Sequence, residues 1–294
     1  MSDHDEVIEV LEKTGDYRVL RRVDLSAIPV VDIPADFSLQ CVVVLDAETT
    51  GLDPDRCSIV ELALRAVWYD EEFRVVALGE PRSWLEDPGE PLSSEIQKLT
   101  GLNDADLHGK VIDAAAVMDI VSQATLVVSH NALFDRRVFE KRFPLLRNLP
   151  WACSCREIRW AERGFDGRGL GSLLMQSRLF SDKAHRAGAD VDAVIVLLMQ
   201  RHQDQTALAE LVAAAGRTTW RVSAIGAHYD LKTYLKERGY FWNPRECFWW
   251  RELEESQLEA EKAWLASAVY APRHYPSAPA PAIERITSRE RHRR

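Results

Sequence analysis

Cysteine is scarce in this chain, which has five cysteines among 294 residues. Their number is odd, and the single Cys-x-Cys pair, Cys153 and Cys155, has no second ligand pair nearby. A disulfide framework needs paired cysteines, and a structural zinc site commonly takes four ligands. The sequence therefore indicates neither, and we expect reduced thiols that are mostly packed in the core.

Long apolar runs are also missing, since none approaches the roughly 20 residues that a membrane-spanning helix needs. The N-terminal segment MSDHDEVIEV lacks the basic-then-apolar pattern of a signal peptide. We therefore expect a cytoplasmic protein with no membrane partner. Hydrophobic residues make up 46% of the chain, which is enough to bury a sizeable core.

An excess of basic residues is absent as well, because the formal net charge is −9. Proteins that coat nucleic acid neutralise many phosphates with Lys and Arg, so the chain is not of that class. An enzyme that grips one strand end is still compatible with this charge. Carboxylates clustered around metal ions count as negative charge, yet they form a site that attracts phosphate once the metals are bound.

Turn residues and shifts in composition divide the chain into five segments. We expect an N-terminal appendage and linker (1–38), a main domain (39–201), a linker helix (202–217), a small Trp-rich module (218–270) and a disordered tail (271–294).

The main domain begins with three strand candidates in near succession, after which helices and strands alternate. The strand candidates are residues 41–46, 59–70, 73–79, 125–130 and 151–155. This order predicts an α/β fold with a mixed sheet covered by helices, because a purely parallel sheet needs a crossover between successive strands.

The Trp-rich module is predicted to form a strand, a helix closed by Gly239 and a hairpin that turns at Asn243-Pro244, with a helix from Glu254 to about Ala268 packed on it. Its rings alternate with Lys and Arg residues, which is typical of surfaces that stack bases and hold phosphates. A module of this size also needs large rings to build a core. The sequence leaves both interpretations open.

Acidic residues in three segments carry the chemistry. Asp46 and Glu48 follow an apolar strand, and alternate strand residues point to the same side, so both carboxylates can face one spot. Asp135 lies in the first turns of a helix that follows the strand at 125–130, and its side chain can point inward. Two like charges at the end of a buried strand need a counter-charge, which a hard divalent cation supplies.

The third segment, AHRAGADVDAVIVLLMQ, places His185 before a helix that is apolar nearly all round. An acid at the start of such a buried helix is costly unless it is paired or bound to a metal. Both Asp190 and Asp192 fit this description, and periodicity does not separate them.

Together these segments resemble the three motifs of the DEDDh, or DnaQ-like, 3′-5′ exonucleases, a group that includes the proofreading subunit of a bacterial replicative DNA polymerase. The motifs are D-x-E-T-T-G from Asp46, H-N-A-x-F-D from His130, and H-x-A-x-x-D from His185. The resemblance covers about residues 39–200 and implies a ribonuclease-H-like fold. A sister group has a tyrosine four residues before the last aspartate, where this chain has Arg186, so the histidine group is the better match.

Carried over by position, the resemblance makes Asp46, Glu48, Asp135 and Asp190 the ligands of two divalent cations, Mg²⁺ or Mn²⁺, and His185 the general base. Of the two acids left open above, only Asp190 has the family's spacing. Less specific parts of the resemblance place Thr49, Gly51, Leu52 and Asn131 near the terminal nucleotide. The implied reaction is metal-dependent hydrolysis of a nucleic acid from a free 3′ end, in DNA repair or proofreading, and DNA is favoured over RNA.

Two alternatives stay open beside a DNA exonuclease: an RNA exonuclease of the same fold, and a scaffold without activity that binds nucleic acid or a polymerase. Contacts to the 2′-hydroxyl separate DNA from RNA, and no residue in the sequence reveals them. The segment QSRLF (176–180) also resembles a sliding-clamp-binding pattern, although Leu179 and Phe180 fit the fold core better.

Overall fold

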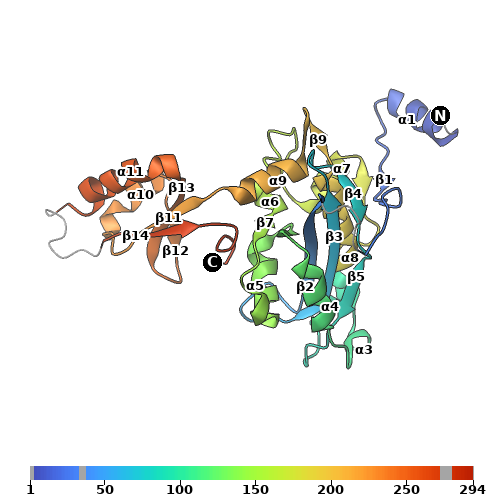
Figure 1. The fold of residues 1–294 in the computed structure, drawn as a ribbon, viewed down its shortest axis with the longest axis horizontal. Helices are drawn as coiled ribbons and strands as arrows, with labels where there is room; N and C mark the ends of the chain where they lie inside the picture. Colours follow the sequence, from blue (N-terminus) through green and yellow to red (C-terminus); the bar gives the residue numbers. More distant parts are fainter. Residues whose placement is uncertain (1–2, 33–37, 272–279, 294) are drawn as a thin grey trace. The chain divides into compact units, whose positions relative to one another are not determined.

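The structure is a computed structural model that describes residues 3–32, 38–271 and 280–293. The described residues fall into two compact units. The first extends to Ala215 and includes His292 and Arg293, and the second runs from Gly216 to Arg291 (Figure 1). The first part of the predicted linker is described, whereas residues 33–37 lie outside the described part.

The first unit is built on a mixed sheet in the order β4-β3-β2-β6-β7, with β5 paired to the same edge of β3 as β4. Strand β3 runs antiparallel to β2, while β6 and β7 are parallel to β2 and to each other. The predicted mixed sheet is therefore confirmed, and β5 is an addition to it. The strands are β2 (Gln40–Thr49), β3 (Ile59–Tyr69), β4 (Val75–Leu78), β5 (Arg82–Leu85), β6 (Leu126–Ser129) and β7 (Trp151–Cys153).

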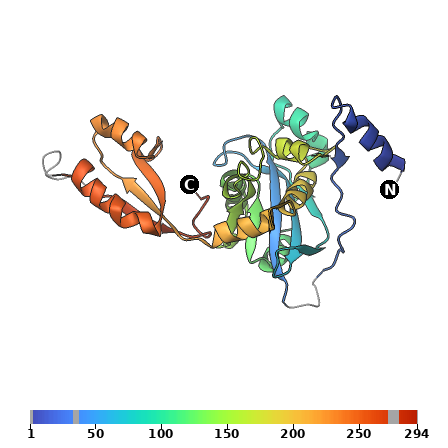
Figure 2. The same ribbon diagram turned by 90° about the horizontal axis from the view of Figure 1, so that it is seen from above.

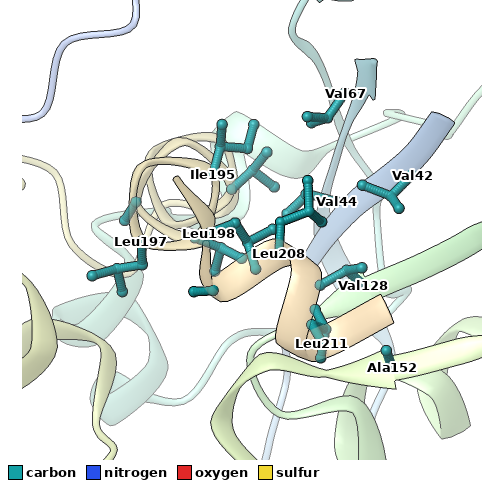
Figure 3. Close-up of a cluster of buried hydrophobic side chains, with 14 of the residues drawn as sticks. Val42, Val44, Val67, Val128, Ala152, Ile195, Leu197, Leu198, Leu208 and Leu211 are labelled. Carbon is teal, nitrogen blue, oxygen red and sulfur yellow. The ribbon is translucent and has the colours of Figure 1, made fainter. Parts of the chain in front are cut away.

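Helices cover both faces of this sheet, as Figure 2 shows from above. Residues Val42 and Val44 of β2 pack against helices α7, α8 and α9, and Figure 3 shows part of this cluster with side chains from α8 and α9. The alternate residues Val43 and Leu45 pack against helices α4 and α5 on the other face. The helices are α4 (Ala114–Ser122), α5 (Ala132–Arg142), α7 (Leu170–Gln176), α8 (Ala187–Leu198) and α9 (Ala207–Gly216).

Shorter elements complete the first unit. Helices α2 and α3 pack over Val60 in a small apolar cluster of their own. Strand β8 pairs with β1, and its Leu179 contacts the main core while Phe180 is 40% exposed. The core interpretation of these two residues thus holds for Leu179 only. The remaining elements are α1 (Asp3–Lys13), β1 (Arg21–Arg22), α2 (Ser94–Thr100), α3 (Asp104–Leu107), η1 (Pro144–Leu146), α6 (Ser154–Glu157), β8 (Leu179–Phe180), β9 (Arg201–His202) and β10 (Gln205–Thr206).

The second unit is a four-stranded antiparallel sheet in the order β12-β13-β11-β14, with two helices packed on it. The predicted strand, helix and hairpin are present, and α10 is followed by Gly239 in the left-handed region, at φ +89°. The elements are β11 (Thr219–Ala224), η2 (Tyr229–Leu231), α10 (Lys232–Glu237), β12 (Phe241–Asn243), β13 (Phe248–Glu254), α11 (Glu255–Trp264), η3 (Leu265–Val269) and β14 (Ala282–Ile286).

Strand β14 corrects the expectation of a disordered tail over 271–294. Residues 282–286 all pair with β11, from Thr219 opposite Ile286 to Ser223 opposite Ala282. The free edge of β11 supplies hydrogen-bond partners, so a short segment beside a Pro/Ala-rich stretch becomes ordered. The part of the predicted tail at residues 272–279 lies outside the described residues.

The rings of the Trp-rich unit divide between core and surface. Trp249 and Tyr240 are buried, whereas Phe241 is 64% exposed and Trp242 is 47% exposed. On the sheet face opposite to Trp249, Phe241 lies against Trp250 with ring centroids 5.9 Å apart, and the Arg221 guanidinium lies 4.9 Å from the Trp250 ring. The core interpretation therefore holds for Trp249 and Tyr240, and stacking of bases on the exposed rings stays a prediction.

Two basic residues that were candidates for holding phosphate are used inside this unit instead. Arg238 and Arg251 both form ion pairs with Glu261, which is buried on α11. The Tyr240 hydroxyl donates to the same carboxylate over 3.0 Å. These groups satisfy a buried charge, so they belong to the core of the unit.

The predicted packing of the cysteines is confirmed for Cys41, Cys57 and Cys153, which are buried, while Cys155 is half-buried and Cys247 is exposed. Burial raises the pKa of the Cys41 thiol to about 11 and that of Cys153 to about 12, so both stay protonated at neutral pH. Within the described residues, no helix combines the length and the apolar character that crossing a membrane requires.

Candidate active site

The site begins at the end of β2. Asp46 and Glu48 share the side of the strand that carries Val42 and Val44, which is the face covered by α8. The pairing of β2 with β3 shifts register between Glu48 and Thr49. Both carboxylates therefore project from the last regular stretch of the strand, before the backbone turns away.

The other acids reach this strand end from helices on opposite faces of the sheet. Asp135 is buried in the first turn of α5, and Asp190 lies in the first turn of α8. His185 precedes α8 in the left-handed region, at φ +63°, and its backbone N–H donates to Asp190 Oδ2 over 3.2 Å. One ligand atom each from Glu48, His185 and Asp190 lies within 4.8 Å of the others. This group joins the first and third motifs, and Asp135 of the second motif lies close enough for its charge to act on Asp46.

The electrostatics also show that the acids form one cluster. The pKa of Asp46 is raised well above its usual range by burial, and by the charges of Asp135, Asp190 and Glu48. Burial, together with the charge of Asp190, raises the pKa of Glu48 to about 7. Burial likewise raises the pKa of Asp135 to about 7. Four carboxylates this close cannot all ionise at low cost unless a positive charge joins them.

A divalent cation fits this donor set. Carboxylate oxygens are the ligands that Mg²⁺ and Mn²⁺ prefer, and a cation would supply the charge that the raised pKa values call for. The described residues of the first unit place a single imidazole among these acids, and no cysteine is included in the cluster. Soft ligation by thiolates is therefore not a feature of the site.

Glu61 is a fifth acid beside the cluster, and the sequence analysis missed it. It lies on β3 directly opposite Glu48, and only 3% of its surface is exposed. Its carboxylate accepts from Arg186 Nε over 2.9 Å, from Ser83 Oγ over 2.9 Å and from the Ala187 backbone N–H over 3.3 Å. Glu61 thereby fastens the residue after His185, and the first residue of α8, to the sheet.

Arg65 on the same strand holds α8 at a second point. Its Nη1 lies 2.8 Å from Asp192 Oδ1. This pairing gives Asp192 a partner outside the acidic cluster, while Asp190 lies inside it. Glu61 and Arg65 are the two charged residues within the apolar run of β3, which marks them in the sequence but does not reveal their partners.

His130, from the second motif, hydrogen-bonds to other parts of the protein through both of its ring nitrogens. Its Nε2 lies 2.8 Å from the Arg168 carbonyl oxygen and its Nδ1 lies 2.9 Å from Ser154 Oγ. A carbonyl only accepts, so Nε2 carries the proton and Nδ1 accepts from the Ser154 hydroxyl. Burial lowers the pKa of this histidine, which keeps it neutral. His130 therefore joins the first residue of α6 to the loop before α7.

Of the residues expected near the terminal nucleotide, Thr49 ends β2, Gly51 and Leu52 follow it, and Asn131 precedes α5. Thr49 is buried and its hydroxyl donates to the Gly51 carbonyl over 2.7 Å, which closes the turn. Leu52, at the next position, is 87% exposed. Asn131 is exposed at the start of α5, and its side chain makes no capping hydrogen bond there. Leu52 thus offers an exposed apolar side chain close in sequence to Glu48, and Asn131 offers an exposed amide close in sequence to Asp135.

Comparison with known families decides the class. Residues 43–198 match the family described as Exonuclease, and this segment is more than half of the chain. The chain belongs to the exonuclease family. The DnaQ-like resemblance drawn from the motifs is thereby confirmed, and the matched segment of this exonuclease includes all five candidate catalytic residues.

Curated relatives of the exonuclease include two polymerases. The DNA polymerase III PolC-type of Streptococcus agalactiae serotype III (strain NEM316) is 26% identical over 181 residues. The PolC-type enzyme of Streptococcus pyogenes serotype M1 is 25% identical over 185 residues. Each match covers 58% of this chain and 12% of the relative, so the chain corresponds to a small part of those proteins.

Solved structures with a similar fold include an Exonuclease X bound to 5′-overhanging duplex DNA. It is 22% identical, with a TM-score of 0.40, over 59% of this chain and 99% of that chain. Another is E. coli Exonuclease I with a dT13 oligonucleotide, 16% identical with a TM-score of 0.46, over 85% of this chain and 64% of that chain.

Proposed function

We propose that this exonuclease degrades nucleic acid from the 3′ end, with DNA as the preferred substrate, and releases nucleoside 5′-monophosphates. The observation that carries the proposal is the convergence of four carboxylates with raised pKa values and one imidazole at the end of β2. Such a group is costly for the fold and is explained by hydrolysis with bound cations.

In this proposal Asp46, Glu48, Asp135 and Asp190 would hold two divalent cations, Mg²⁺ or Mn²⁺. The bound cations supply a water of lowered pKa and neutralise charge at the scissile phosphate. His185 would accept the proton of the attacking water, because an imidazole side chain can act as a general base. The backbone N–H of His185 donates to Asp190, and this hydrogen bond keeps His185 beside a proposed metal ligand.

In this proposal the turn after β2 positions the 3′ end of the nucleic-acid substrate. Leu52 would lie against the last base, and Asn131 would donate to the substrate strand. The bond from Thr49 to the Gly51 carbonyl holds this turn in shape. These contacts need a free 3′ end, and they orient the phosphate relative to His185.

The test is degradation of a 5′-labelled single strand, a duplex and an RNA of one sequence, with Mg²⁺, with Mn²⁺ and with excess EDTA. We expect a ladder of one-nucleotide steps that depends on the metal, and no cutting of circular DNA or of a strand ending in a 3′-phosphate. Asp46→Asn is the inactive control. Full activity in EDTA, or cutting of circles at a comparable rate, would contradict the proposal, and a ladder on RNA alone would assign the substrate to RNA.

The proposal extends to a role in DNA repair or proofreading in the cytoplasm. The PolC-type relatives are polymerases by name, so a polymerase is the partner class to test, by co-purification with the tagged exonuclease. A sliding clamp is the second candidate. The exposed Phe180 of the QSRLF segment is the position to change, because Leu179 is part of the core.

A further inference from the structure

A basic hollow of about 550 Å³ lies beside α5 in the first unit, outside the acidic cluster. Its cations come from three segments: Arg137 and Lys141 from α5, Arg147 from the segment that follows η1, and Arg293 from the end of the chain. Two acids, Asp55 and Glu140, also line it.

The acids do not cancel this positive charge. Glu140 pairs with two guanidinium groups: its Oε1 lies 2.8 Å from Nε of the fully buried Arg136 and 3.5 Å from Nε of Arg293, so one negative charge faces two positive charges. Asp55 pairs with Arg137. Lys141 donates to the backbone carbonyls of Asp55 and Cys57, over 3.1 and 2.9 Å, and its charge remains. The hollow thus keeps a surplus of positive charge in a chain whose formal charge is −9.

Two features connect the hollow to the candidate active site. Helix α5 also carries Asp135, and Lys141 comes six residues later, which is about 9 Å along a helix axis. Asp55 lies in the loop that follows Leu52, and Lys141 holds that loop through its backbone. A polyanion that leaves the acidic cluster along α5 therefore meets cations within a short distance.

We propose that this hollow binds the phosphodiester backbone of the substrate strand, upstream of the nucleotide being removed. The proposal rests on the proposed function and defines the substrate as a chain of several nucleotides. At about 3.4 Å per nucleotide along a strand, a span of 9 Å takes about three nucleotides. A dinucleotide ends before the hollow, and a longer strand reaches it.

The test compares Arg147→Gln and Arg293→Gln, singly and together, with Arg201→Gln as the matched control. Arg147 is exposed, and Arg201 belongs to strand β9, which lies apart from α5 in Figure 1. Binding of a labelled 20-nucleotide single strand is measured by fluorescence anisotropy across a salt series in EDTA. Turnover on the 20-mer and on a dinucleotide is measured with Mg²⁺.

Each lost phosphate contact should lower the slope of log K against log salt by about 0.7, which is about 5-fold in affinity at 0.1 M salt. We therefore expect the double variant to bind the 20-mer about 25-fold more weakly, with a higher KM on the 20-mer but the same kcat. The dinucleotide should be cut as by the wild type. The control should not change any of these values.

Unchanged slopes and KM values in an active enzyme would overturn the inference. The inference would also be overturned if the variants bound DNA like the wild type but bound an acidic protein more weakly, because the hollow would then bind a protein partner. Weakened binding in a protein that degrades none of the substrates would leave the hollow in place and reject the proposed function instead.

Discussion

Replacement of Asp135 by Asn should stabilise the metal-free enzyme at neutral and alkaline pH. Burial raises the pKa of Asp135 from its usual 3.8 to about 7, so the folded protein favours the protonated form. The stability that protonation contributes is fully present below pH 3.8 and is lost as the pH rises through 7. Asparagine has a similar shape and no charge to lose, so the variant avoids this loss.

The size of the effect follows from the shift. A rise of about three pKa units corresponds to about 4 kcal/mol, as an order of magnitude for a group coupled to other acids. For a unit of about 200 residues, 1 kcal/mol changes Tm by roughly 2 to 4 °C. We therefore expect Asp135→Asn to raise Tm by about 10 °C in EDTA at pH 8, and by much less at pH 4.5.

The assay is thermal unfolding followed by circular dichroism at half-unit steps from pH 4.5 to 8.5, in EDTA and with Mg²⁺. Mg²⁺ should raise the Tm of the wild type most at pH 8, because ligand binding to the folded state adds stability. Asp192→Asn is the matched control, and it should destabilise, since it leaves the buried Arg65 without its carboxylate. An Asp135→Asn variant no more stable than wild type in EDTA at pH 8 would refute the reasoning.

Four further outcomes are expected. Asp190→Asn should lower kcat by several orders of magnitude in oligonucleotide degradation while the circular dichroism spectrum stays the same. His185→Ala should lower kcat far more than it raises KM and should alter the acidic limb of the pH-rate profile. His185→Asn is the control for the backbone, since asparagine tolerates the left-handed region. Glu61→Gln, which weakens the ion pair to Arg186, should lower kcat and also the affinity for Mn²⁺, measured by titration calorimetry. Phe241→Ala combined with Trp250→Ala should raise KM on long single strands by roughly 5- to 150-fold without changing KM on dinucleotides, and equal KM values on the long strands would assign these rings to another role.

The catalytic motifs were predictable because each is local. The apolar run before Asp46 and the helix starts at Asp135 and Asp190 are set by neighbours in the sequence, and their spacing matched a family. The choice between Asp190 and Asp192 was not available from periodicity. It depends on Arg65, which lies on a strand 127 residues earlier in the chain.

Other features could not be predicted because they also depend on contacts between residues far apart in the sequence. Glu61 acquires its role from Arg186, 125 residues away, and a single glutamate in an apolar strand does not reveal its partner. Strand β14 forms because β11 offers an unpaired edge, whereas its own composition indicates little order. The hollow beside α5 needs Arg293 to return to the first unit, which is a tertiary event without a local signal.

The acidic cluster is assembled from both sides of the sheet, and this makes the spacing of its ligands sensitive to the core. Asp190 moves with α8, whose apolar residues pack on one face, while Asp135 moves with α5 on the other face. A cavity under either helix, such as Val194→Ala or Phe139→Leu, would let one ligand settle toward the sheet without touching the other. The affinity for the cation would then depend on how closely each helix packs on the sheet. Mutations in either core layer would change cation binding, and with it activity, without touching a ligand.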